Sequence, residues 1–391
     1  MKIETVDLFY LSMPIVTEEA DGSQDALLVR VTAGGFTGWG ECEAAPLPSI
    51  AAFVCPKSHG VCRPVQESII GQRLDDISDI ARISVLANYN SMDLLQAPHT
   101  LSGIEMALWD LLGRRLDAPA WSLLGHQKSC DKIPYASLLF GDTPQQTFER
   151  ARTACHQGFR AAKFGWGPIG RTTAADDGAH FTAAREGLGA ESDLMVDVGQ
   201  IFGEDVDAAA ARLSFMDEAR IRWFEEPFEA GALAAYADLA NRPANVRIAG
   251  GEAAHNYHMA EHLMTYGQIG YIQIDCGRIG GLGPAQRVAN TAKARGIPYV
   301  NHTFTSHLAL SASLQPFAGF QDDYICEYPA APKQLALDIT RNHITPDANG
   351  YIRAPETAGL GMEIATDQLK PYLVETEIKV GNQIIYQTPT L

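Results

Sequence analysis

Three acidic residues end short apolar runs at a regular spacing. Asp197, Glu225 and Glu252 close the runs DLMVD, RWFE and RIAGGE, and they are 28 and 27 residues apart. That period is about one strand plus one helix, and its repetition predicts a (β/α)₈ barrel in which strand-end side chains meet on one face. Three carboxylates that meet there form an all-oxygen ligand set, so we expect them to bind Mg²⁺ or Mn²⁺. The alternative is three unrelated acids on a solvated rim.

Four more strand ends carry polar side chains. Asp275 and His302 end the sixth and seventh predicted strands. Adjacent strands lie about 4.8 Å apart, so the carboxylate can hydrogen-bond the imidazole, fix its tautomer and raise its basicity. Lys163 ends the second strand and either pairs with a barrel acid or offers its ammonium to a substrate anion. Glu327 ends the eighth strand, as an acid beside the metal or as a protonated donor to an enolate oxygen.

The composition narrows the possible partners. The chain has 391 residues and a net charge of −17, which argues against nucleic acid and anionic membranes as partners. An anionic substrate therefore needs a local cation. Seven scattered cysteines without a CxxC pair indicate reduced thiols. We find no apolar span of membrane length and expect a soluble, cytoplasmic protein.

The pattern of elements predicts two modules. Strands in residues 1–12 and 26–39 are followed by helices in residues 64–125, one of them covering 102–113 with Ser102 as its cap. Residues 14–25 and 44–60 are expected to be loops, the second lying over a pocket. From residue 133 strands alternate with helices, including one long helix over 206–219. The expected division is an α+β capping domain at 1–130, a barrel at 131–334, and a segment at 335–391 that returns to the capping domain. The eight predicted strands are 133–139, 160–164, 194–198, 222–225, 247–249, 271–275, 299–302 and 324–327.

An ordered set of motifs then points to a known family. The set includes GWGE ending at Glu41, IEMALWD at 104–110, LLG at 123–125, EEP at 225–227, RIGG at 278–281 and PETAGLG at 355–361. Together with the strand-end residues, these make the chain resemble the enolase superfamily, and within it the mandelate racemase branch. The resemblance implies a (β/α)₇β barrel under an α+β cap, Mg²⁺ on the three acids, and Glu226 as a partner of the ligand set. It also implies a homo-oligomer and removal of the proton α to a substrate carboxylate.

Two departures from the family pattern bear on the reaction. Family racemases carry Lys-x-Lys at the end of the second strand, whereas this chain reads Lys163-Phe-Gly165-Trp166. Gly199 stands where relatives commonly have asparagine. Racemisation needs a base on both faces of the enolate, and dehydration does not. Trp166 either covers the substrate or packs in the barrel.

We therefore expect a lyase, a Mg²⁺-dependent dehydratase of a sugar acid (aldonate or aldarate) that yields a 2-keto-3-deoxy acid. The expected catalytic residues are His302, Asp275, Lys163 and Glu327, and Lys163, Trp166 and Arg278 are expected to contact the small carboxylate substrate. A racemase or epimerase of a hydroxy or amino acid is the alternative, followed by a catalytically silent structural or binding protein.

Overall fold

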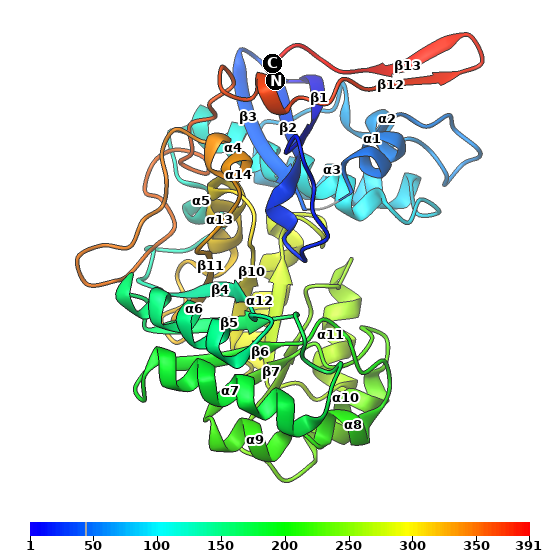
Figure 1. The fold of residues 1–391 in the computed structure, drawn as a ribbon. Coiled ribbons are helices and arrows are strands. Elements are labelled where there is room, and N and C mark those ends of the chain that lie inside the picture. Colours follow the sequence, from blue (N-terminus) through cyan, green and yellow to red (C-terminus); the bar gives the residue numbers. More distant parts are fainter. Residues whose placement is uncertain (44) are drawn as a thin grey trace.

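The computed structural model describes residues 1–43 and 45–391, and eight parallel strands form its centre. Their hydrogen-bonded order is β10-β9-β8-β7-β6-β5-β4-β11, so β4, the first strand of the ring, pairs with the last. The sheet therefore curls into a nearly closed barrel (Figure 1). The strands are β4 (Ile133–Leu139), β5 (Ala161–Gly165), β6 (Asp193–Asp197), β7 (Ile221–Glu225), β8 (Arg247–Gly250), β9 (Tyr271–Asp275), β10 (Tyr299–His302) and β11 (Ile325–Pro329).

Helices surround this barrel. They are α6 (Pro144–His156), α7 (Ala174–Leu188), α8 (Val206–Ala210), α9 (Leu213–Glu218), α10 (Leu233–Ala240), α11 (Tyr257–Tyr266), α12 (Leu282–Ala294), α13 (His307–Leu314) and the 3₁₀ turn η2 (Gln315–Phe317). The expectation of a single helix over residues 206–219 is wrong, because the helix is interrupted between α8 and α9. Arg212 lies at this break, buried, and its guanidinium binds Asp177 and the carbonyl oxygens of Ala208 and Thr172.

A three-stranded antiparallel sheet begins the capping domain. It contains β1 (Ile3–Ser12), β2 (Asp25–Ala33) and β3 (Phe36–Cys42), with the 3₁₀ turn η1 (Gly22–Gln24) before β2. Helix α4 packs directly on β3. A Cβ atom on Gly38 or Gly40 would lie 2.1 Å from the carbonyl oxygen of Ala107 or Gly103, so this close approach requires glycine. The other helices are α1 (Pro46–Val54), α2 (Gln66–Ile69), α3 (Ile77–Asn90), α4 (Ala97–Leu116) and α5 (Ala120–Leu123).

Two expectations for this domain are wrong. Residues 46–54 form helix α1 instead of a loop, and Ile50, Phe53 and Val54 are buried in the core instead of covering a pocket. Residue 44, where that expected loop began, lies outside the described residues. Helix α4 begins at Ala97, so Ser102 is an interior residue whose hydroxyl donates to the Pro98 carbonyl oxygen.

The carboxy-terminal segment returns to the capping domain, as expected. It contains α14 (Gln334–Asp338), η3 (Lys370–Tyr372) and the hairpin of β12 (Glu377–Val380) and β13 (Gln383–Gln387). The Val374 amide donates to the Tyr10 carbonyl oxygen at 2.8 Å, and the Tyr386 hydroxyl donates to that of Leu8 at 2.6 Å. Figure 1 shows both termini beside each other at the sheet of the cap. The fold class predicted from the sequence is confirmed, while the domain boundaries stay predictions. Within the described residues, no helix combines the length and apolarity needed to cross a membrane.

Candidate active site

Each barrel strand contributes one residue to a buried apolar layer inside the barrel. The layer consists of Tyr135, Ala161, Met195, Trp223, Ala249, Tyr271, Val300 and Ile325. Side chains on a strand alternate between its two faces, so the residue two positions further also points inward, one layer nearer the carboxyl ends. Those residues are Ser137, Lys163, Asp197, Glu225, Gly251, Gln273, His302 and Glu327. Most of the candidate residues therefore share a single layer because of strand register.

Asp197, Glu225 and Glu252 lie together in the structure. Each offers a carboxylate oxygen, and these three atoms lie within 4.8 Å of one another. Asp197 and Glu225 end β6 and β7, whereas Glu252 follows β8 by two residues. Burial raises the pKa of Asp197 well above its ordinary value, and the charge of Glu225 adds to that rise. The cluster is thus a compact set of hard oxygen donors, with Asp197 and Glu225 buried and Glu252 partly exposed.

Lys163 is the cation inside this cluster. Its ammonium lies 2.5 Å from Glu225 Oε1, 3.0 Å from Glu327 Oε1 and 3.8 Å from Asp197 Oδ2. Burial opposes its charged form, but the charges of Glu225 and Glu327 outweigh burial and raise the pKa of Lys163 well above its ordinary value. The second oxygen of Glu225 accepts from Trp223 Nε1 at 2.8 Å and Gln273 Nε2 at 2.6 Å. Both interpretations of Lys163 given by the sequence are compatible with this position.

His302 and Asp275 form the expected pair. His302 Nδ1 lies 2.7 Å from Asp275 Oδ2, and Asp275 Oδ1 accepts from the Gly277 amide at 2.6 Å. The other ring nitrogen, Nε2, lies 3.1 Å from Glu252 Oε2. Burial lowers the basicity of His302, but the carboxylates around it, Glu252 first, raise its pKa to about 10. The imidazole therefore lies directly beside the acid cluster with one nitrogen anchored.

Arg278 connects the cap to the acid cluster. Its Nε donates to Glu43, which follows β3, and its Nη1 donates to Glu252 Oε1 at 3.0 Å. Burial acts against the charge of Glu252, but His302 and Arg278 lower the pKa of Glu252 to about 2. Arg278 also lines the cavity described next, which is compatible with the expected contact with substrate. That contact stays a prediction.

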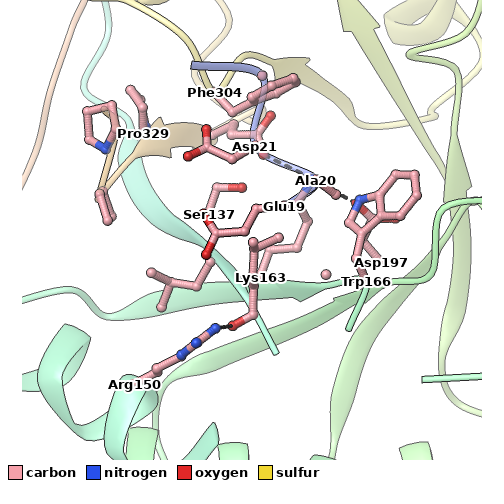
Figure 2. A pocket seen from close by; sticks show the side chains of 18 of the residues that line it. Glu19, Ala20, Asp21, Ser137, Arg150, Lys163, Trp166, Asp197, Phe304 and Pro329 are labelled. Carbon is pink, nitrogen blue, oxygen red and sulfur yellow. Dashed lines mark hydrogen bonds and ion pairs between the residues drawn. The ribbon is translucent and has the colours of Figure 1, made fainter. Parts of the chain in front are cut away.

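A cavity of about 930 Å³ opens above these residues, between the barrel and the cap. Figure 2 shows Lys163, Trp166 and Asp197 in this cavity together with Glu19, Ala20 and Asp21 from the loop after β1. Trp166 is 41% exposed and has a left-handed backbone, with φ of 60°. A Cβ atom on Gly199 would lie 2.6 Å from its ring, so the indole occupies the space beside Gly199. Gly199, one departure from the family pattern, therefore lies against the residue that follows the other departure, Gly165.

Glu226 has a different environment from its neighbour Glu225. Its carboxylate accepts from Gln200 Nε2 at 3.1 Å, and burial, with the charge of Glu252, raises its pKa to about 8.

Sequence reasoning missed Glu43, Ser137, Arg150 and Lys333. Ser137 could have been found, because it follows the buried Tyr135 by two positions on β4. Arg150 and Lys333 carry no comparable signal, since an exposed helix position and a loop lysine are common everywhere.

Comparison with known proteins agrees with this geometry. Residues 146–368 match the family described as "Enolase C-terminal domain-like". Residues 8–125 match the family described as "Mandelate racemase / muconate lactonizing enzyme, N-terminal domain". A crystal structure described as a predicted mandelate racemase from Rhodobacter sphaeroides is 75% identical, with a TM-score of 0.96 and 99% of each chain covered.

Two relatives of known activity are more distant. D-galactarolactone cycloisomerase of Agrobacterium fabrum is 28% identical over 86% of this chain and 88% of its own length. L-talarate/galactarate dehydratase of Salmonella typhimurium is 27% identical over 65% of this chain and 64% of its own length.

A capped parallel barrel with three acids at its strand ends is the architecture of the enolase superfamily. Within that superfamily, the chain belongs to the mandelate racemase/muconate lactonizing enzyme family, which confirms the resemblance found in the sequence. It is thus a member of an enzyme family whose characterised relatives include a lyase and an isomerase.

Proposed function

We propose that this protein is a Mg²⁺-dependent dehydratase of a sugar acid and forms a 2-keto-3-deoxy acid. The observation that carries the proposal is one cavity in which the three-acid cluster lies beside a single anchored imidazole, His302, with no second lysine at position 165. The dehydratase and cycloisomerase among the relatives support the same class of chemistry.

The acid cluster fits Mg²⁺. Asp197, Glu225 and Glu252 supply only oxygen atoms, all within 4.8 Å of one another, and hard divalent cations prefer such donors. Lys163 brings one positive charge to Asp197, Glu225 and Glu327, and Arg278 pairs with Glu252 from the side of the cap. A divalent cation bound there would supply positive charge next to a substrate carboxylate and favour the build-up of negative charge on its oxygens.

Lys163 and Glu327 are placed to bind the reacting carboxylate. The Lys163 ammonium donates hydrogen bonds to an anion, and Glu327, when protonated, donates another. The Thr303 amide holds Glu327 Oε2 at 2.6 Å, so the remaining oxygen is directed toward Lys163. Together they stabilise the enolate that forms when the α-proton leaves.

His302 is placed to move the proton. Asp275 accepts from Nδ1, so the neutral form of the imidazole presents Nε2 as the acceptor for the α-proton from carbon 2 of the substrate. The same proton then passes from Nε2 to the hydroxyl leaving carbon 3, and water is released. The enol product takes up a proton at carbon 3 and becomes the 2-keto-3-deoxy acid, which balances the reaction without an oxidant or reductant.

The lining of the cavity favours dehydration over racemisation, because both of its lysines are already paired with carboxylates among the described residues. Among the described residues, the cavity is lined by one histidine, His302, and by two lysines, Lys163 and Lys333. Lys333 is bonded to Glu19 at 2.8 Å. Gly165 has no side chain that could act as a base. A Cβ atom at this position would lie 3.3 Å from Asp197 Oδ2. A racemase would need a proton donor on the opposite face of the enolate.

A panel of aldonates and aldarates, incubated in D₂O with Mg²⁺ and the purified protein, tests the proposal. We expect at least one acid sugar to give a 2-keto-3-deoxy acid with deuterium at carbon 3. Recovered substrate with inverted configuration and deuterium at carbon 2, without keto product, would instead identify a racemase or epimerase. No reaction across the panel would refute the dehydratase assignment.

A further inference from the structure

We propose that the substrate carries a second anionic group at the end of its chain away from the reacting carboxylate, and that Arg150 binds it. This inference rests on the proposed function and narrows its substrate class, from any sugar acid to a doubly anionic one. Arg150 belongs to helix α6, outside the layer of strand-end residues.

Helix α6 turns a polar face toward the cavity. Gln146, Arg150, Thr153 and Gln157 all line it. The first three lie on α6 and Gln157 caps its carboxyl end, and their spacing of four, three and four residues places them on one side of the helix. Amide and hydroxyl groups in such a row can hydrogen-bond the hydroxyls of a sugar chain. The cavity therefore continues from the acid cluster to a second polar wall.

Arg150 differs from the other cations of the cavity. Lys163, Arg278 and Lys333 each form an ion pair with a carboxylate. Arg150 forms none among the described residues, where its Nη1 donates to the carbonyl oxygens of Leu139 at 2.8 Å and Phe140 at 2.9 Å. Those two bonds hold the guanidinium at the end of β4 and leave Nε and Nη2 free to form a two-point contact with an anion.

The position of Arg150 suits the length of an acid sugar. Ser137 on β4 is in register with Lys163 on β5, and Leu139 lies two residues further along the strand. Arg150 is thus anchored about 7 Å above the level of Lys163, at roughly 3.3 Å per residue. The two carboxyl carbons of an extended six-carbon diacid are about 6 Å apart, taking roughly 1.2 Å of advance per bond. Hydrogen bonds of about 2.9 Å at each end extend this span, so one such molecule can reach both cations.

Three acids that line the cavity together with Arg150 are already engaged. Glu19 binds Lys333 at 2.8 Å, and this hydrogen bond is the main cause of its lowered pKa, with a smaller contribution from the charge of Arg150. Asp21 accepts from the amide and hydroxyl of Ser23, and Glu149 accepts from Gln145. Glu19 remains the competitor for Arg150, and a bound anion has to bind more strongly than it does.

Binding measurements on Arg150→Gln test the inference. The probes are a six-carbon aldonate, the aldarate of the same configuration, and the 6-phosphorylated aldonate, each titrated with Mg²⁺ in the His302→Asn background so that none is consumed. Arg152→Gln, an exposed arginine of the same helix that does not line the cavity, removes the same charge and serves as the control.

We expect the parent protein to bind one of the two doubly anionic probes at least about tenfold more tightly than the aldonate. Arg150→Gln should remove that preference, and Arg152→Gln should retain it. Which probe is preferred identifies the second group as a carboxylate or a phosphate. A parent protein without preference, or one that binds no probe, would overturn the inference.

Equal weakening of all three probes by Arg150→Gln would also overturn the inference, because it would show that Arg150 only supports the turn after β4. The result of these binding measurements can be separated from the result of the assay for 2-keto product. An Arg150-dependent preference without 2-keto product from the active protein would leave the anion site in place and reject the dehydratase assignment.

Discussion

Replacing Asp275 by asparagine tests the anchored imidazole most sharply. In the structure, Asp275 Oδ1 accepts from the Gly277 amide at 2.6 Å and Oδ2 binds His302 Nδ1 at 2.7 Å. Asparagine has one acceptor oxygen for these two contacts. If that oxygen keeps the Gly277 contact, the amide NH₂ faces Nδ1, and the imidazole must carry its proton on Nε2. It then cannot accept the α-proton.

The magnitude follows from the charge as well as the tautomer. Two unit charges about 4 Å apart interact by roughly 4 kcal/mol at an effective dielectric constant of 20. Loss of that support for the protonated imidazole corresponds to a factor of about 10²–10⁴ in turnover, at about 1.4 kcal/mol per tenfold. We expect Mg²⁺ affinity to change much less, since Asp275 is not one of the three clustered acids.

The assay compares kcat/KM at saturating Mg²⁺, Mg²⁺ affinity by calorimetry, and thermal unfolding. Asp177→Asn is the matched control: Asp177 is also buried, pairs with Arg212 at 2.9 Å and does not line the cavity. It should lower the unfolding temperature and leave kcat unchanged. Asp275→Asn with activity within about threefold of the wild type would refute the reasoning, as would an equal loss in both variants.

Three further outcomes are expected. His302→Asn should keep the fold and Mg²⁺ binding but lower turnover by at least about 10²-fold, and near-normal activity would reject its role. Glu252→Gln should weaken Mg²⁺ binding by at least about tenfold in calorimetry, and unchanged affinity would remove Glu252 from the ligand set. His307 is buried and stacked on His343 with ring centroids 4.4 Å apart, and burial, with the charge of His343, lowers its pKa to about 4. Because the folded pKa lies below the unfolded value of about 6.5, its stabilisation is present above pH 6.5 and lost as pH falls toward 4. Urea denaturation should show about 2 kcal/mol lost from this source between pH 7.5 and 5, which His307→Gln removes. An unchanged pH slope in that variant would contradict the assignment.

The barrel and its central layer were predictable because both depend on local periodicity. Strand ends such as Asp197 and Glu225 carry a spacing signal, and alternation along β4 would have added Ser137. Helix α1 was not predicted in this way: residues 46–54 contain two prolines and read as a loop, yet in the structure they form a helix that begins at Pro46 and buries Ile50, Phe53 and Val54.

Long-range contacts carried no local signal. Arg278 joins Glu43 and Glu252, three residues from distant parts of the chain, so its partners depend on how the cap sits on the barrel. The break at Arg212 similarly depends on the buried Asp177 of another helix. Arg150 stands out only once its side chain is seen to form no ion pair with a carboxylate of the described residues.

A crystal structure of the His302→Asn variant with Mn²⁺ and an acid sugar, with the metal located by anomalous scattering, tests the central claim most directly. We expect one metal peak about 2.1–2.3 Å from oxygens of Asp197, Glu225 and Glu252, with the substrate carboxylate beside it and carbon 2 facing residue 302. A peak elsewhere, no peak, or a substrate whose carbon 2 faces away from residue 302 would contradict the account.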